Sequence, residues 1–275
     1  MDKTRLGKPD FEALHIFKQC CWPTDGEDSI KPTKLYSSRA LVDQENTREF
    51  DKLTTTIHEY KAIDWQPSSD DCEGRNMLDK LQAGQNLRLR IGAQVMLVAN
   101  LSVSEGLVNG SRGIVVGFVS LAQATSQLEN QGGLRGDDES RDLAIFARGE
   151  EMKFPQVLFK VRNVPKLVHP FKPPLIQAII TPYKWKVALD YRLDAYRIQI
   201  PLISAWALTI HKCQGMTLEK CEVNLNHCFG FGMAYVALSR SKSREGLQIV
   251  GWMGGKEIRA DPVVEAFYKD IKERV

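Results

Sequence analysis

The stretch ISAWALTIHKCQG (residues 203–215) begins the part of the chain that decides its fold class. We interpret it as a helix-like segment that ends at Gly215, because an apolar run closes on a glycine there. LEKCEVNL (218–225) is typical of a strand, GFGMAYVALSRSKS (230–243) of a helix and LQIV (247–250) of a second strand. Helices and strands that alternate in this way predict an α/β layer domain for the last third of the chain.

The first third of the chain and its end contain elements of the same kind. Residues 11–19 predict a short helix, and TKLYSS (33–38) predicts a short buried strand. RALVDQENTREFDKL (39–53) has the spacing of a helix, whereas TIHEYKAIDW (56–65) alternates apolar and polar residues as a half-buried strand does. DPVVEAFYKDIKERV (261–275) predicts a closing amphipathic helix. We therefore expect an α/β domain that is interrupted in the middle of the chain.

The middle of the chain consists of short β-type runs separated by Gly, Pro and Asn. Several short strands at such spacing predict a small barrel. NGSRG (109–113) predicts a hairpin turn, because Asn-Gly readily adopts the positive φ values of tight turns. Residues 122–142 are polar and Gly-rich, and we expect a mobile surface loop there. The β-type runs are residues 87–101, 106–120, 155–164, 175–189 and 195–202.

The composition is that of an ordinary folded protein of one large or two small domains. The 275 residues are 43% hydrophobic and 26% charged. There is no run of about 18 apolar residues, which argues against a membrane span, and the first residues lack the apolar stretch of a secretory signal. The six cysteines form no CxxC pair, so we expect reduced thiols. The net charge of +3 permits a local nucleic-acid-binding patch without arguing for one.

Four segments, in series along the chain, resemble the motifs of one enzyme family. They are PTKLYSSRALVDQEN (32–46), IGAQVMLVANLSVSEGLVNGSRGIVVGF (91–118), AWALTIHKCQGMTL (205–218) and YVALSRSKSREGL (235–247). The first, third and fourth resemble motifs IV, V and VI of the petite-integration-frequency (Pif) DNA helicases, in the RecD-like branch of superfamily one. The second resembles the stretch that opens the SH3-like barrel of that branch.

The resemblance implies a fold with two parts. Residues 1–86 and 200–275 would form a RecA-like domain of the P-loop-NTPase type, the second of two motor domains and one without a Walker A motif. Residues 87–199 would form an inserted small SH3-like β-barrel that carries the polar loop at 122–142.

The resemblance also implies residues that contact ATP. Phosphoryl transfer places negative charge on the transferred oxygens, and a guanidinium group from a facing domain stabilises that charge. Arg240, in ALSR, resembles this catalytic arginine finger, and Arg39, in SSR, resembles a second arginine that senses phosphate. Gln214 and Gly215 resemble the motif V turn that approaches the γ-phosphate, where glycine permits a close backbone approach. Cys213 departs from the family pattern, which has Ser in HKSQG.

A second set of residues is implied to contact single-stranded DNA. Thr209 and His211 would hydrogen-bond phosphate oxygens without reading bases, and Lys212 would add a non-specific phosphate contact. Ser38 in motif IV and Asn109 in the barrel are further candidates, although Asn109 also fits the role of a turn-forming residue. The implied DNA partner is single-stranded or forked.

Two patterns suggest a metal site but lack the surroundings that one needs. DDES (137–140) resembles a Mg²⁺-binding pair but lacks the apolar strand that would position one, so we expect it to be solvated. A group of His and Cys residues invites a zinc interpretation, yet its spacings fit none of the common zinc frameworks. We therefore predict no metal site formed by this chain alone. The His and Cys residues in question are His211, Cys213, Cys221, His227 and Cys228.

The phosphate-binding loop of an ATP site is missing from the sequence. GxxxxGK[ST] is needed to surround the phosphates with backbone N–H groups and a lysine, but Gly7-Lys8 and Gly255-Lys256 are followed by Pro and Glu. The resemblance therefore implies that the N-terminal RecA-like domain, which holds most of the ATP and Mg²⁺ contacts, is a separate partner. We expect this chain alone to be inactive as an ATPase.

The function that follows is the C-terminal motor half of an ATP-dependent 5′-to-3′ DNA helicase, resident in the nucleus, the mitochondrion or both. The alternative is a stand-alone or degenerate module that binds single-stranded nucleic acid without ATPase activity. The two hypotheses differ in whether the ATP-facing residues are still needed, because only a helicase hydrolyses ATP. Arg39, Gln214, Gly215 and Arg240 all match the family pattern, which favours the helicase.

Overall fold

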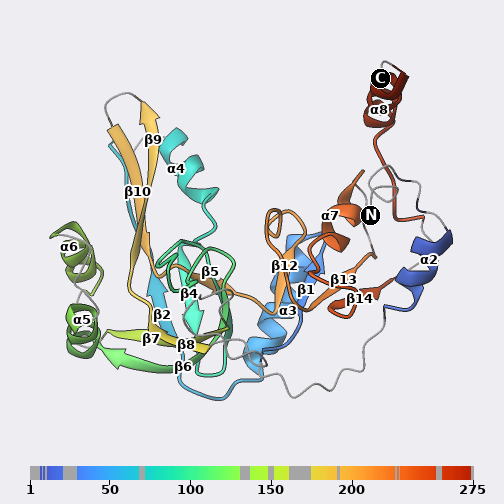
Figure 1. Ribbon diagram of the computed structural model, residues 1–275. Coiled ribbons are helices and arrows are strands. Elements are labelled where there is room, and N and C mark those ends of the chain that lie inside the picture. Colours follow the sequence, from blue (N-terminus) through green and yellow to red (C-terminus); the bar gives the residue numbers. More distant parts are fainter. Residues whose placement is uncertain are drawn as a thin grey trace. The chain divides into compact units, whose positions relative to one another are not determined.

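The chain folds into two compact units (Figure 1). Unit 1 comprises residues 1–49 and 205–275, and unit 2 comprises residues 50–204. Residues 50–86, which the sequence-based division placed in the α/β domain, therefore cluster with unit 2. The computed structural model describes residues 7, 9, 11–20, 30–67, 72–130, 137–147, 152–160, 175–190, 193–226, 228, 230–251 and 256–273.

Unit 1 contains a four-stranded parallel sheet with the strand order β12-β1-β13-β14. Its strands are β1 (Thr33–Tyr36), β12 (Ala207–Thr209), β13 (Cys221–Asn224) and β14 (Leu247–Val250). Its helices are α2 (Phe11–Lys18), α3 (Arg39–Asp51), which runs into unit 2, α7 (Met233–Leu238) and α8 (Pro262–Glu273). The predicted alternation of strands and helices is thus confirmed at both ends of the chain. No helix in the described ranges is long and apolar enough to cross a membrane.

The prediction of a helix over residues 203–215 is wrong. The segment contains the end of β11 (Leu202–Ser204), then β12, and then a series of turns. Every residue from Ala205 to Ile210 is buried. A short apolar run that is buried on all sides has the same periodicity as a buried helix segment, so the pattern alone does not separate the two.

A side-chain amide protects the edge of the parallel sheet. β12 is an edge strand, and an edge strand leaves the N–H and C=O of alternate residues unpaired. Asn46 on α3 binds both groups of Ala207: its Nδ2 donates to the Ala207 carbonyl (3.1 Å), and the Ala207 N–H donates to its Oδ1 (2.9 Å). One side chain therefore replaces the missing neighbouring strand and holds α3 against the sheet.

Unit 2 contains the antiparallel strands that were expected in the middle of the chain. A five-stranded sheet has the order β11-β5-β6-β7-β8, a three-stranded sheet the order β3-β10-β9, and β2 pairs with β4. β5 and β6 pair in antiparallel fashion, but residues 98–111 connect them, so the tight Asn-Gly turn predicted at NGSRG does not join the two strands. Gly110 has a φ of 91°. The strands are β2 (His58–Lys61), β3 (Ile63–Trp65), β4 (Asn86–Leu89), β5 (Gln94–Leu97), β6 (Arg112–Ser120), β7 (Lys153–Lys160), β8 (Leu175–Ile179), β9 (Tyr183–Asp190) and β10 (Leu193–Gln199).

The polar stretch at 122–142 is not the loop that the sequence suggested. Most of it lies in two helices, α5 (Leu121–Asn130) and α6 (Asp137–Phe146), which join β6 to β7. Ala124 of α5 and Leu143 and Phe146 of α6 are buried, so each helix has at least one apolar side chain packed against unit 2. The polar composition of the stretch obscured these few buried positions. A third helix of unit 2, α4 (Cys72–Asp79), contacts β9 and β10.

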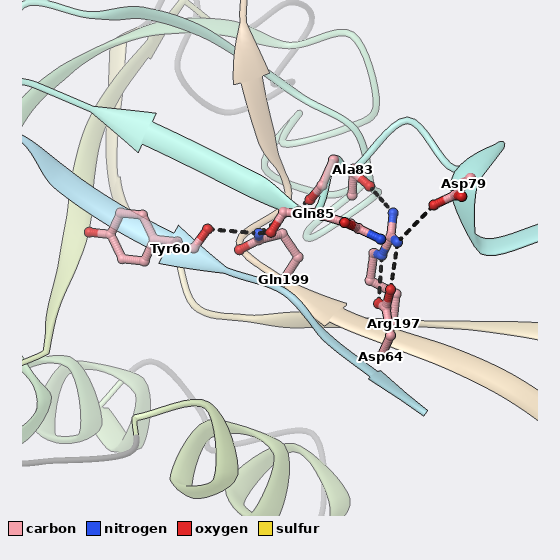
Figure 2. A network of polar contacts seen from close by, with 8 residues as sticks. Tyr60, Asp64, Asp79, Ala83, Gln85, Arg197 and Gln199 are labelled. Atoms are coloured by element: carbon pink, nitrogen blue, oxygen red, sulfur yellow. Dashed lines mark hydrogen bonds and ion pairs between the residues drawn. The ribbon is translucent and has the colours of Figure 1, made fainter. Parts of the chain in front are cut away.

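A buried arginine connects the three-stranded sheet to the segment that follows α4. Arg197 on β10 is 1% exposed. Its Nε and Nη2 donate to the two carboxylate oxygens of Asp64 on β3 (2.7 and 2.6 Å), and its Nη1 donates to the Ala83 carbonyl (2.8 Å). Figure 2 shows these groups, together with Asp79 (3.6 Å from Nη2), converging on the guanidinium. The side chain of Gln199, two residues along, donates to the Tyr60 carbonyl (3.1 Å).

We predict that Asn46→Ala lowers the free energy of unfolding by about 2–4 kcal/mol, because it leaves two backbone groups of Ala207 without partners. Urea unfolding followed by circular dichroism measures the change. Gln44→Ala, an exposed position on the same helix, is the matched control and should stay within about 0.5 kcal/mol of the parent chain. Equal stability of the two variants would contradict a role for Asn46 at the sheet edge.

The Arg197–Asp64 pair predicts an asymmetry between its two partners. Asp64→Ala leaves a buried guanidinium with only the distant Asp79 to compensate it, at a cost of about 3–5 kcal/mol. Arg197→Met should cost less, because methionine packs in the same space and the side chain of Asp64, 30% exposed, can be hydrated instead. Urea unfolding of both variants tests the order, and a larger loss for Arg197→Met would refute it.

Candidate functional site

The candidate site lies at the edge where two parallel strands end. β1 and β12 pair with Tyr36 opposite Thr209, and the Ile210 N–H donates to the Tyr36 carbonyl (3.0 Å). The segments that follow each strand therefore leave the sheet at the same edge, which is where open α/β sheets bind ligands. Ser38 and Arg39 follow β1, and the turn from His211 to Gly215 follows β12.

The turn after β12 is held by its own hydrogen bonds. The Lys212 N–H donates to the Thr209 hydroxyl (3.2 Å), and the Cys213 N–H donates to the Thr209 carbonyl (3.2 Å). The Gln214 N–H then donates to the His211 carbonyl (3.3 Å). Gly215 has a φ of +77°, and a Cβ there would meet no atom within 4 Å. Backbone conformation, not crowding by neighbours, is therefore what calls for glycine at this position.

Arg240 lies beside this turn. Its Nη1 donates to the Met216 carbonyl (3.2 Å), its Nε to the Val236 carbonyl (2.9 Å) and its Nη2 to the Ser239 hydroxyl (2.9 Å). The backbone strengthens the link, because the Leu218 N–H donates to the Arg240 carbonyl (2.7 Å). These side-chain bonds use three of the five N–H groups of the guanidinium. Arg240 makes no ion pair with any carboxylate in the described residues.

Positive charge accumulates at the turn. Burial lowers the pKa of the Lys212 ammonium, the guanidinium of Arg39 lowers it further, and the carboxylate of Asp43 opposes both. Arg39 itself is exposed and makes no hydrogen bond or ion pair with the described part of the chain. Three positive charges, those of Arg39, Lys212 and Arg240, thus lie at or beside one short turn. The carboxylate of Asp43 is the acidic group that attracts the Lys212 ammonium.

The structure separates the sequence-predicted residues into three groups. Arg39, Lys212, Gln214, Gly215 and Arg240 all lie at or beside the turn, with the exposed side chain of His211. Two others have local structural tasks: Thr209 is buried with its hydroxyl on Lys212, and the Ser38 hydroxyl accepts the Leu41 N–H (3.4 Å) at the start of α3. Asn109 lies in unit 2, where its N–H donates to the Asn100 side chain (2.8 Å).

Ser37 is a residue of the site that the sequence reasoning missed. It is 6% exposed, and its hydroxyl has no hydrogen-bond partner in the described residues. A signal for it was present in the sequence, because Thr33, Leu35 and Ser37 continue one period-two pattern into the sheet edge. An unpaired buried hydroxyl two residues before Arg39 in the chain adds a donor to the group of residues that could hold an anion.

The His and Cys residues considered for zinc do not form a metal site in the described part of the chain. No group of three or more His, Cys, Asp or Glu side chains is arranged there to hold a metal ion. Cys213 and Cys221 are buried free thiols, and His227 lies outside the described residues.

Comparison with known proteins identifies the family. Residues 79–118 match the family model "DNA helicase Pif1, 2B domain". The chain is 34% identical to the human "ATP-dependent DNA helicase PIF1" over 99% of its own length and 32% identical to that of Emericella nidulans over 98%. The Pif1 helicase structure from Candida albicans superposes with a TM-score of 0.74 at 30% identity, covering 98% of this chain and 56% of that one.

The chain belongs to the Pif1 helicase family. It spans 35% and 37% of the lengths of the human and Emericella relatives. A Pif1 structure from Bacteroides that is bound to single-stranded DNA, with a TM-score of 0.55 at 21% identity, covers 99% of this chain and 53% of its own and shares the fold. The similarity to Pif1 helicases therefore extends beyond the four motif-like segments to nearly the whole length of this chain.

The packing of the turn predicts the reactivity of Cys213. Burial raises the pKa of its thiol to about 12, although the nearby guanidinium of Arg240 lowers that pKa in part. The Sγ donates a hydrogen bond to the Ile210 carbonyl (3.0 Å). At pH 8 only about one thiol in ten thousand would be ionised, and the thiolate is the reactive form. We expect iodoacetamide to modify Cys213 at least about 100-fold more slowly in the native chain than in urea, measured by mass spectrometry. Similar rates in the two conditions would show that the turn is open.

Proposed function

We propose that this chain is the C-terminal motor part of an ATP-dependent DNA helicase. The main support for this proposal is that residues from three segments, distant in the sequence, lie around one turn at the carboxyl edge of a parallel sheet. These residues are Arg39, Gln214, Gly215 and Arg240. In this proposal unit 1 is the second RecA-like domain and lacks a Walker A motif. The antiparallel strands of unit 2 include the SH3-like barrel.

The donor groups at the turn fit a polyphosphate. Guanidinium groups come from Arg39 and Arg240, an amide from Gln214 and a hydroxyl from Ser37, all of which bind phosphate oxygens. This set contains no carboxylate, so the Mg²⁺ that accompanies ATP would be held by the first RecA-like domain. ATP, when bound, supplies the phosphoryl group and the free energy of its hydrolysis. The relatives named ATP-dependent DNA helicases support this assignment.

Each arginine has a separate task in this mechanism. The Val236, Ser239 and Met216 contacts fix the guanidinium of Arg240 and leave two N–H groups for oxygens on which charge develops. Arg39, which has no partner in the described residues, would bind phosphate and so report on the presence of nucleotide. Both actions need a facing domain, which explains why this chain alone should not hydrolyse ATP.

The DNA-facing part of the proposal rests on the same turn. His211 is exposed and Lys212 carries a charge that burial disfavours, so both gain from a phosphate contact. Thr209 would contribute by shaping the turn that presents them, and Ser38 through the start of α3. Asn109 would contribute from unit 2. The proposed partner is single-stranded or forked DNA, with movement from 5′ to 3′ and action in the nucleus or mitochondrion.

The alternative, a nucleic-acid-binding module without ATPase activity, would need only the DNA-facing residues. It leaves the geometry of Arg240 without a purpose, because three hydrogen bonds direct that side chain along the turn. A test of hydrolysis therefore separates the two functions.

We predict that the chain hydrolyses ATP only when mixed with a Walker-containing first domain of a Pif1 helicase, and that DNA stimulates the mixture. Arg240→Ala should reduce the rate of phosphate release by about 1000-fold or more, the usual effect of losing an arginine finger. Lys242→Ala, two residues away and exposed, is the matched control and should retain the parent rate. DNA binding without hydrolysis in any mixture would favour the binding module, and hydrolysis by the chain alone would refute the proposal.

A further inference from the structure

The three-stranded sheet of unit 2 carries a row of aromatic and basic side chains on one face. In the antiparallel register Lys186 on β9, Tyr196 on β10 and Trp65 on β3 lie directly opposite one another. Side chains at opposed positions share a face of the sheet. Figure 1 shows β9 and β10 as a long pair of strands. None of the three residues belongs to the motifs that support the proposed function.

The two aromatic rings in this row stack on one another. The rings of Trp65 and Tyr196 lie nearly parallel, with centroids 5.4 Å apart and 11° between their planes. The Lys184 ammonium lies 4.4 Å from the centroid of the Tyr196 ring, a cation–π contact, and pairs with Asp142 of α6 (3.1 Å). Trp65 is nevertheless 43% exposed. The indole is therefore supported on one side and accessible to solvent over much of the rest.

The opposite face of the same sheet holds the row in place. Asp64 precedes Trp65, Arg197 follows Tyr196, and the two form the buried pair drawn in Figure 2. β3 is a three-residue edge strand, and this two-pronged ion pair fixes it against β10. The stacked pair of Trp65 and Tyr196, of which Trp65 is exposed, is thus rigidly supported, which lowers the entropy lost when a ligand stacks on it.

The charges around the row favour an anionic ligand. Lys186 is exposed and directly opposite Tyr196, and Lys184 lies one row away. Among the side chains that the structure describes, the acidic groups on this face are Asp142, already paired with Lys184, and Asp194, an exposed residue opposite Ala188. An accessible indole next to a lysine matches the two features of single-strand binding surfaces, which are a ring for the base and a cation for the phosphate.

We infer that Trp65, Tyr196 and Lys186 form a stacking platform for an unpaired base of single-stranded nucleic acid. The base would stack on the accessible side of Trp65 and extend the order of rings that begins at Tyr196. Lys186 would contact the adjoining phosphate. The platform belongs to unit 2 and the turn belongs to unit 1. The platform therefore adds a second contact surface to the proposed function and does not depend on ATP chemistry.

Fluorescence anisotropy of the whole chain with a short labelled oligothymidine tests the platform. Trp65→Ala should weaken binding at least about fivefold, because losing one base–aromatic stack has that effect or more. Trp65→Phe keeps a ring and should restore most of the affinity. Phe11→Ala, which removes an exposed aromatic ring from unit 1, is the matched control and should bind like the parent. Lys186→Ala should reduce the salt dependence of log K by about 0.7–1.

Two further measurements separate base stacking from a purely electrostatic contact with the strand. An abasic oligonucleotide of equal length should bind equally to the parent and to Trp65→Ala. If Trp65→Ala weakened binding of the abasic strand as much as it weakens binding of oligothymidine, the platform would be overturned. Photo-cross-linking of an iodouracil-substituted strand should label Trp65 or Tyr196 in the parent chain, independent of any variant. Oligouridine in place of oligothymidine shows whether RNA, DNA or both provide the base.

Failure of this inference is distinguishable from failure of the proposed function. Parent-like binding by Trp65→Ala, with loss of binding by His211→Ala, would overturn the platform and leave the turn in unit 1 intact. Loss of binding by Trp65→Ala, with no ATP hydrolysis in any mixture, would support the platform and remove the motor assignment.

Discussion

The pairing of β1 with β12 is the constraint on which the site depends. Lys34 and Ala207 are opposite one another in this pair, although all of unit 2 lies between them in the sequence. The register places Tyr36 opposite Thr209, which sets where both segments leave the sheet. The Asn46 amide holds the outer side of β12 and ties α3, which begins at Arg39, to the same strand. A shift of one residue would move Arg39 and the turn apart and reverse every inward side chain.

Local sequence patterns predicted the elements whose neighbours are close in the chain. The strand TKLYSS, the helix after it and the strands LEKCEVNL and LQIV were all correct, because turn residues or helical spacing mark them. The tight Asn-Gly hairpin was not, because residues 98–111 connect β5 to β6. Residues 203–215 were not, since β12 owes its form to pairing with β1 and burial on both sides. The helices at 121–130 and 137–146 were missed because their stability comes from a few buried residues such as Leu143 and Phe146.

The sequence singled out candidate residues for the site but not the contacts that each of their atoms makes. Family resemblance singled out Arg39, Gln214, Gly215 and Arg240, and the structure brings them around one turn. It could not show that the Thr209 hydroxyl already binds Lys212 within the chain, or that Ser37 has a buried hydroxyl without a partner in the described residues. Such facts depend on which way a side chain points at the end of a strand, and that direction is decided by register and burial across the whole sheet.

The charge distribution at the turn is itself an argument for a ligand. Repulsion between the like charges of Arg39 and Lys212 raises the free energy of the folded chain, and partial burial of Lys212 raises it further. Attraction between Lys212 and the Asp43 carboxylate offsets part of this increase. If the segment served folding alone, an uncharged side chain at position 212 would be more stable. An anion placed at the turn would reverse the sign of these interactions, so a strained pair of cations becomes a preformed site. A local cost of this kind is what preorganised binding requires.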